Sequence, residues 1–139
     1  MAAIKIYADT GPLVAYLSET DQYHRWATAA FQSFDEPLLT CEAVVSEALF
    51  LLRFDGVSVE SFLALLERGA IRVNFSMEEN RADLLALLRK YADQPMSLAD
   101  ACLVRMAELN DHCQIFTTDK DFRVYRRKGR GVLPLIAPF

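Results

Sequence analysis

The feature that most constrains the fold of this chain is a regular alternation of short apolar segments with longer segments of helical periodicity. The apolar segments that predict strands lie at residues 3–8, 37–40, 71–75, 113–117 and 132–135. The segments that predict helices lie between them, at residues 11–18, 21–33, 42–54, 58–68, 78–91 and 98–110. Strands joined by helices need crossover connections, which make the strands parallel and place helices on both faces of the sheet. We therefore expect an α/β fold of three layers, α/β/α, with a mostly parallel central sheet.

Polar side chains at the expected helix starts predict how the helices are capped. The candidate caps are Thr40, Ser58, Ser97 with Asp100, and Thr118 with Asp121. The last two pairs have the spacing of a capping box, in which each side chain bonds the backbone N–H of the other residue. We expect Asp121 to have this structural role, or to support a nearby site without binding its ligand.

Length and composition bound the organisation of the chain. Its 139 residues suit one domain with one core, expected over residues 1–139. The apolar stretches are interrupted well before the ~20 residues that a membrane span needs, and the start lacks the pattern of a signal peptide. The three cysteines form no Cys-x-x-Cys pair, so we expect reduced, mostly buried thiols in a cytoplasmic protein, with no zinc site.

The net charge of −4 argues against a protein that binds nucleic acid by its overall charge. Near the C-terminus, however, basic residues outnumber a single acid, Asp121. They are Lys120, Arg123, Arg126, Arg127, Lys128 and Arg130, hereafter the basic stretch. Such a run is either a solvated surface or, beside a suitable site, a contact for a phosphate backbone.

Two carboxylates follow expected strands directly. Asp9 lies in "IKIYADTGPLVAYL" and Asp119 in "IFTTDKDF". Each alone can cap the following helix, but ligands of a parallel sheet bind beyond the carboxyl ends of its strands, where both acids are expected. The letters Asp-Thr-Gly also occur in aspartic proteases. That interpretation needs an all-β body, which the helical periodicity contradicts.

Glu47 lies within the expected helix 42–54, in "EAVVSEALFLLRF". Its neighbours on the same helical face are Val44, Leu51 and Phe54, all apolar. A charge buried on such a face is costly unless it is paired or bound to a metal. The alternatives are a glutamate that reaches solvent at the margin of the face, or one paired with Arg53.

Asp100, near the start of helix 98–110, can be a cap, a metal ligand, or an acid stabilised by the helix dipole. With Asp9, Glu47 and Asp119 it makes a set of four acids without a conventional nucleophile. Clustered carboxylates repel one another unless a cation is bound. Oxygen ligands suit Mg²⁺ or Mn²⁺, which lower the pKa of bound water and clamp phosphoryl oxygens. The set therefore predicts a nuclease site, and the basic stretch a contact for its substrate.

In "YADTGPLVAYL", "VVSEALFLL", "MSLADACLVRMAEL" and "IFTTDKDF", in that order and spacing, the chain resembles PIN-domain ribonucleases, specifically the VapC-type toxins of bacterial toxin–antitoxin pairs. The resemblance covers essentially the whole chain. It implies Mg²⁺- or Mn²⁺-dependent hydrolysis of RNA, with Asp9, Glu47 and Asp100 holding a first ion and Asp119 completing the acidic cluster. It also implies a homodimer and a cognate antitoxin protein.

The resemblance gives supporting roles to the hydroxyls beside two of the acids. Thr10 is expected to orient the site, and Thr118 is placed similarly before Asp119. The RNA contacts are expected from the basic stretch, at Lys120, Arg123, Arg126, Arg127 and Lys128. At Ser97 this chain departs from close relatives, which often carry a further acid there. That difference bears on the affinity for metal.

One rival function is discounted, and two others remain alternatives. A phosphatase of the haloacid dehalogenase class also has an aspartate after its first strand, but it needs a second one two positions later, where this chain has Gly11. A PIN-like module that only binds RNA or protein would be expected to lack some of the acids. A PIN nuclease of RNA processing, without an antitoxin, has the same residues as a toxin.

Overall fold

The computed structural model describes residues 3–139, and its centre is a five-stranded sheet in the order β3-β2-β1-β4-β7. The strands are β1 (Lys5–Ala8), β2 (Leu38–Thr40), β3 (Ile71–Val73), β4 (Cys113–Phe116) and β7 (Leu135–Ile136). Each neighbouring pair is parallel. The expected α/β class is therefore confirmed, with β1 and β4 inside the sheet and β3 and β7 at its edges.

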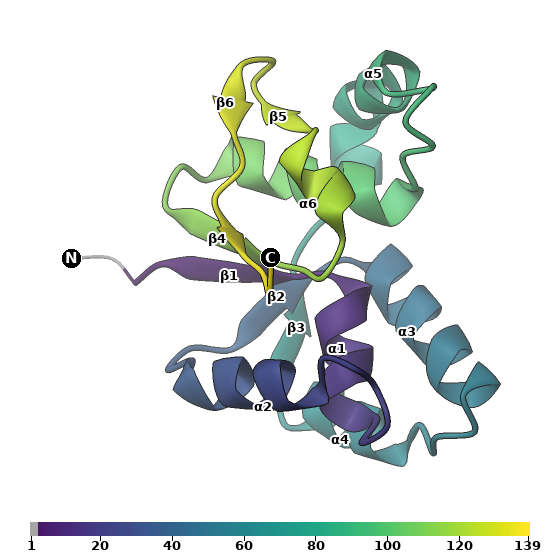
Figure 1. The fold of residues 1–139 in the computed structure, drawn as a ribbon. Coiled ribbons are helices and arrows are strands. Elements are labelled where there is room, and N and C mark those ends of the chain that lie inside the picture. The colour runs from purple at the N-terminus through teal and green to yellow at the C-terminus, as the bar shows by residue number, and fades with distance from the viewer. Residues whose placement is uncertain (1–2) are drawn as a thin grey trace.

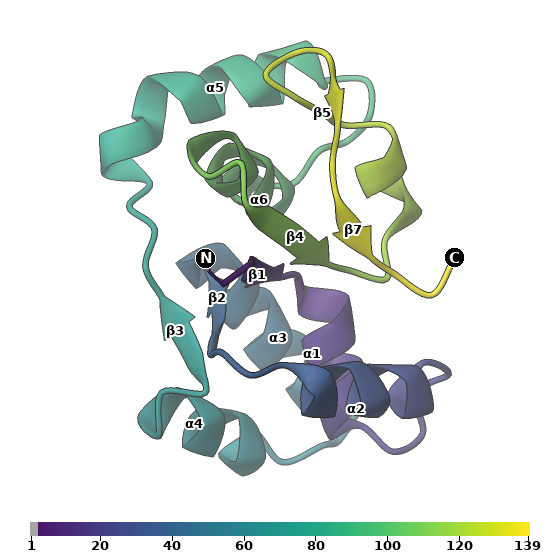
Figure 2. The same cartoon turned by 90° about the vertical axis from the view of Figure 1, so that its left-hand side faces the viewer.

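Helices cover both faces of this sheet, as Figures 1 and 2 show. The helices are α1 (Thr10–Leu17), α2 (His24–Ser33), α3 (Glu42–Phe54), α4 (Glu60–Glu67), α5 (Arg81–Lys90) and α6 (Leu98–Leu109). In both views α5 and α6 lie on one side of the sheet, and α1 to α4 lie on the other. Short 3₁₀ helices, η1 (Glu78–Asn80) and η2 (Lys120–Arg123), precede α5 and follow β4. The three expected layers are thus present.

The helix α6 is the most deeply embedded element of its layer, because eight of its twelve residues are buried. The predicted capping box at its start is confirmed. The Ser97 hydroxyl accepts a bond from the Asp100 N–H at 3.0 Å, and the Asp100 carboxylate accepts one from the Ser97 N–H at 3.3 Å. Because both hydrogen bonds of this capping box are formed at a buried helix, the first turn of α6 has a defined position.

Two other predicted caps are wrong, and a third is shifted. Thr40 does not cap α3, because its hydroxyl donates instead to the carbonyl of Ala8 at 2.7 Å and ties β2 to the end of β1. Thr118 and Asp121 form no capping box, since the Asp121 N–H donates to the side chain of Asp119 at 2.8 Å. The Ser58 hydroxyl accepts the Glu60 N–H at 3.2 Å, but Ser58 lies one residue before the N-cap position of α4, which Val59 occupies.

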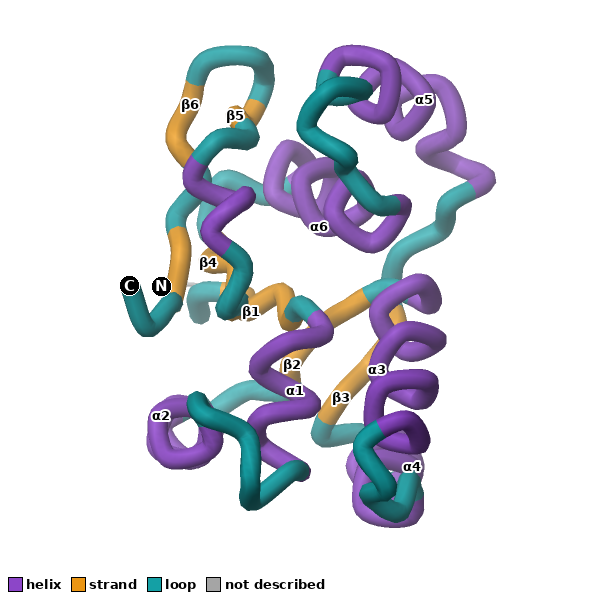
Figure 3. The backbone as a smooth tube through the Cα atoms, turned by 45° about the vertical axis from the view of Figure 1, so that its right-hand side comes forward, coloured by secondary structure: helices purple, strands orange, loops and turns teal. Residues whose placement is uncertain are grey.

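The end of the basic stretch begins a hairpin that the sequence pattern did not predict. Its strands β5 (Arg126–Arg127) and β6 (Gly131–Val132) pair antiparallel, and Figure 3 shows them at the same end of the molecule as α5 and α6. Lys128 and Gly129 in its turn both have positive φ, which matches the twist of paired strands. The single strand expected at 132–135 is therefore two strands, β6 and β7.

Candidate active site

Three of the four predicted acids converge at one edge of the sheet. Asp9 follows β1, Asp119 follows β4, and Asp100 lies in the first turn of α6. One carboxylate oxygen from each lies within 4.8 Å of the others. The parallel pairing of β1 with β4, in which Ala8 is opposite Phe116, brings the first two together as expected.

Asp9 is buried, with 6% of its surface exposed, and each of its carboxylate oxygens accepts one hydrogen bond. Oδ1 accepts from the Thr10 N–H at 2.8 Å, and Oδ2 accepts from the Thr117 hydroxyl at 2.7 Å. Burial raises the pKa of Asp9 to about 7, against the lowering effect of these two bonds, and the charges of Asp100 and Asp119 raise it further. The fold therefore holds a carboxylate that a nearby cation would strongly stabilise.

Asp100 serves as the helix cap, as one interpretation predicted, and the same carboxylate belongs to the acidic cluster, which keeps it a candidate metal ligand. Its Oδ2 accepts a bond from the hydroxyl of Tyr125 at 2.9 Å, in addition to the Ser97 N–H. Burial raises the pKa of Asp100, and the nearby charge of Asp119 adds to this effect against the hydrogen bonds from Tyr125 and Ser97.

Thr117 joins two of the acids. Its hydroxyl donates to Asp9 and accepts the backbone N–H of Asp119 at 2.9 Å. A supporting role was expected at Thr118 instead, but that residue packs its side chain over Gly11, where an added Cβ atom would collide with the Thr118 hydroxyl. The signal that identifies Thr117 is the strand register, because it is the residue of β4's extension opposite Asp9.

Glu47 lies beside the cluster rather than inside it. Its carboxylate accepts a bond from the Thr10 hydroxyl at 2.9 Å, so one threonine connects it to Asp9. Glu47 is exposed, because the helical face it shares is covered only at Val44, and Phe54 on that face is 78% exposed. Of the alternatives for Glu47, the structure therefore matches a glutamate that reaches solvent at the margin of the face. Among residues 3–139 it forms no ion pair with Arg53.

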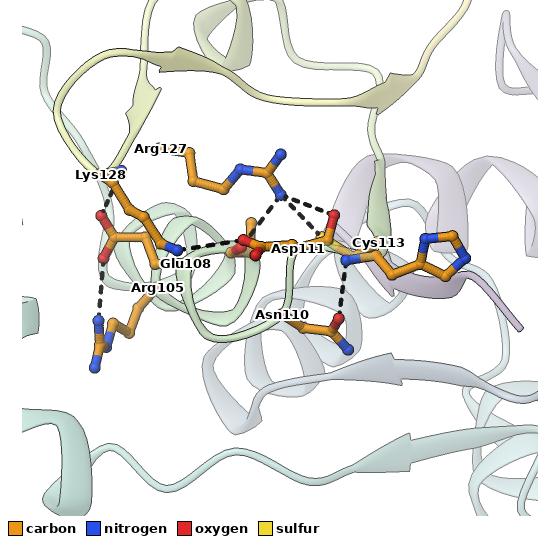
Figure 4. A network of polar contacts seen from close by, with 9 residues as sticks. Arg105, Glu108, Asn110, Asp111, Cys113, Arg127 and Lys128 are labelled. Atoms are coloured by element: carbon orange, nitrogen blue, oxygen red, sulfur yellow. Dashed lines mark hydrogen bonds and ion pairs between the residues drawn. The ribbon is translucent and has the colours of Figure 1, made fainter. Parts of the chain in front are cut away.

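The residues of the basic stretch have two different environments. The side chains of Arg126, Arg127 and Lys128 hold the hairpin in place. Arg126 donates to three carbonyls at the end of η2. Arg127 donates to the Ala107 carbonyl at 3.4 Å, and Lys128 pairs with Asp111 at 3.2 Å (Figure 4).

Lys120 and Arg123 also have exposed side chains, and they lie on η2, which begins immediately after Asp119. Within residues 3–139 the Lys120 ammonium has no ion-pair partner. The Arg123 guanidinium lies over the ring of Phe139, 5.5 Å from its centroid. These two cations are the part of the basic stretch that is available to a ligand at the acidic edge.

Only carboxylates contribute to the cluster, and this donor set fits a hard divalent cation such as Mg²⁺ or Mn²⁺. Asp9, Asp100 and Asp119 could hold the ion. Asp119 Oδ1 already accepts the Asp121 N–H, so each of the three carboxylates is oriented by at least one backbone donor. The cysteines at positions 41, 102 and 113 are free, buried thiols, as expected.

We expect Thr117→Val to destabilise the protein by about 1–3 kcal/mol, because it leaves the Asp119 N–H and Asp9 Oδ2 without their partner. Thr117→Ser keeps the hydroxyl and should retain most of that stability. Urea unfolding monitored by circular dichroism measures both, with Thr118→Val as the matched control. A larger loss for Thr118→Val than for Thr117→Val would contradict this assignment.

We expect the metal-free protein to lose stability as the pH rises, because the pKa of Asp9 is raised to about 7 in the fold. The contribution of its neutral form is fully present below the unfolded pKa of about 4 and is lost as the pH passes through the folded value. Asp9→Asn removes this loss, so its melting temperature in EDTA should exceed that of the wild type increasingly towards high pH. The exposed Asp55→Asn is the control. Parallel profiles for wild type and Asp9→Asn would contradict the prediction.

The PIN domain family model matches residues 6–128. No curated protein is significantly similar to the chain. Among solved structures, the crystal structure of VapC20 from Mycobacterium tuberculosis, described as a sarcin-ricin loop cleaving toxin, has a TM-score of 0.75 at 20% identity, over 94% of this chain and 100% of that chain. At this identity the likeness concerns the fold. Because the family model spans most of its length, the chain belongs to the PIN domain family.

Proposed function

We propose that this protein is a metal-dependent endoribonuclease that acts as the toxin of a toxin–antitoxin pair in the cytoplasm. The observation that carries the proposal is the convergence of Asp9, Asp100 and Asp119 from three separate elements. Membership of the PIN domain family and the shared fold with a toxin described as cleaving the sarcin-ricin loop support it. Among the described residues, no helix has the length and apolarity needed to cross a membrane.

The proposed mechanism assigns each acid a task. Asp9, Asp100 and Asp119 would hold Mg²⁺ or Mn²⁺, and Glu47, whose carboxylate accepts the Thr10 hydroxyl, would add a fourth negative charge beside them. When bound, the ion would lower the pKa of the attacking water and neutralise negative charge on the phosphate. The hydrogen bonds from Thr10, Thr117 and the Ser97 N–H keep the carboxylates in place during the reaction.

Substrate binding is assigned to the exposed cations of η2. Lys120 and Arg123 lie next to Asp119 in the chain and would contact phosphates beside the scissile bond. Arg126, Arg127 and Lys128 act on RNA indirectly, by fixing the hairpin and the end of η2 against α6.

Two protein partners also belong to this proposal, a second copy of the chain and an antitoxin. Phe50 and Phe54 on α3 stack at 6.2 Å between ring centroids, and they are 65% and 78% exposed. Exposed apolar surface of this kind is typical of contacts between proteins. Light scattering of the purified chain measures its oligomeric state.

We expect Asp100→Asn to lower the rate of RNA cleavage at least 100-fold with Mn²⁺ or Mg²⁺, because the cluster loses both a charge and a ligand oxygen. Cleavage of structured RNAs by the purified protein, with and without EDTA, measures this. Glu78→Gln removes an exposed acid outside the site and should leave the rate unchanged. In cells, the wild type but not Asp100→Asn should arrest growth when it is expressed without an antitoxin.

Other outcomes would identify a different function. RNA binding without cleavage across a broad panel would favour a non-catalytic PIN-like module. Metal-dependent cleavage without growth arrest would favour a nuclease of RNA processing. Cleavage that persists in Asp100→Asn would contradict the assigned site.

We expect the double variant Lys120→Ala with Arg123→Ala to weaken RNA binding and to reduce the slope of log affinity against log salt by about 1–2, because two phosphate contacts are lost. Arg127→Ala should lower the melting temperature and leave the salt slope close to that of the wild type, since the Arg127 guanidinium donates to carbonyls of the protein itself. Fluorescence anisotropy at several salt concentrations, in EDTA to prevent cleavage, measures both. The opposite ranking of the two variants would contradict this division of the basic stretch.

A further inference from the structure

Tyr125 lies between η2 and β5, and its side chain is completely buried although it ends in a hydroxyl. Its ring packs edge-on against Tyr91 and Phe122, at 5.1 Å and 5.3 Å between centroids. This packing on two sides leaves the ring little freedom to turn. The hydroxyl therefore has a defined position.

That hydroxyl donates to Asp100 Oδ2 at 2.9 Å, the same oxygen that accepts the Ser97 N–H at 3.3 Å. Two donors on one oxygen define the rotation of the carboxylate about its Cβ–Cγ bond. Its other oxygen, Oδ1, accepts no hydrogen bond from residues 3–139 and is left for a ligand. A phenol buried without a partner would be costly, so the arrangement stabilises the hydroxyl and orients the acid together.

Tyr91 has a similar environment but a different polar contact. It is buried in the same aromatic cluster, and its hydroxyl accepts the backbone N–H of Arg126 at 2.9 Å. Removing either hydroxyl thus breaks one hydrogen bond made by the same aromatic cluster. Only the change at Tyr125 reaches the acids.

We propose that Tyr125 is a positioning residue of the metal site, which holds the Asp100 carboxylate in the orientation that binds the ion. This inference rests on the proposed function, and it extends that function to a residue that is 25 positions from Asp100 in sequence and outside the expected site. Partners that orient metal ligands in this way typically change metal affinity 10–100-fold when they are removed.

The test compares Tyr125→Phe with Tyr91→Phe and the wild type. Free Mn²⁺, measured by its electron paramagnetic resonance signal during titration, gives the dissociation constant without any need for activity. Thermal unfolding in EDTA measures the structural cost of each variant. The rate of RNA cleavage is then measured at limiting and saturating Mn²⁺.

We expect Tyr125→Phe to weaken Mn²⁺ binding about tenfold, and to lose more activity at limiting than at saturating Mn²⁺. Tyr91→Phe should melt at a lower temperature but bind Mn²⁺ within about twofold of the wild type, since it leaves Asp100 in place. Equal Mn²⁺ affinities for Tyr125→Phe and the wild type would overturn the role of Tyr125 and leave the proposed function intact. A wild type that binds no Mn²⁺ would overturn both.

Discussion

The site depends first on the parallel pairing of β1 with β4 inside the sheet. Their register places Ala8 opposite Phe116, so Asp9 and Thr117 emerge side by side at the same edge. A shift of one residue would send every side chain to the opposite face and separate the acids. The bond from Thr40 to the Ala8 carbonyl joins β2 to the same point. The relative position of Asp9 and Thr117 is thus a property of the sheet, while α6 supplies Asp100.

The fold holds three carboxylates close together, although their negative charges repel one another. Asp9 and Asp100 are buried and their pKa values are raised, chiefly because burial disfavours the charged form. Hydrogen bonds from Thr10, Thr117 and Tyr125 act in the opposite direction and keep the carboxylates oriented. A bound divalent cation would relieve the remaining repulsion, so binding of metal and stability of the fold are linked.

The basic stretch illustrates how neighbouring residues of one charge can serve different purposes. A sequence pattern identifies a run of cations but not the direction of each side chain. Arg127 reaches carbonyls at the end of α6, and Lys128 pairs with Asp111, so both stabilise the hairpin. Lys120 and Arg123, on the exposed side of η2, remain available to a polyanion. Arg127 and Lys128 belong to a short hairpin with its turn at Lys128 and Gly129, whereas Lys120 and Arg123 precede it in η2.

The sequence by itself determined the α/β class, most helix positions, the capping box at Ser97 and three acids that meet, because periodicity and strand ends are local signals. Only the tertiary structure decided which hydroxyls support those acids. Thr117 and not Thr118 bridges Asp9 and Asp119, and Tyr125 reaches Asp100, since both contacts depend on strand register and on packing between distant segments. It also placed Glu47 at the exposed margin, because the cover of a helix face is set by its neighbours in space and not by its own pattern.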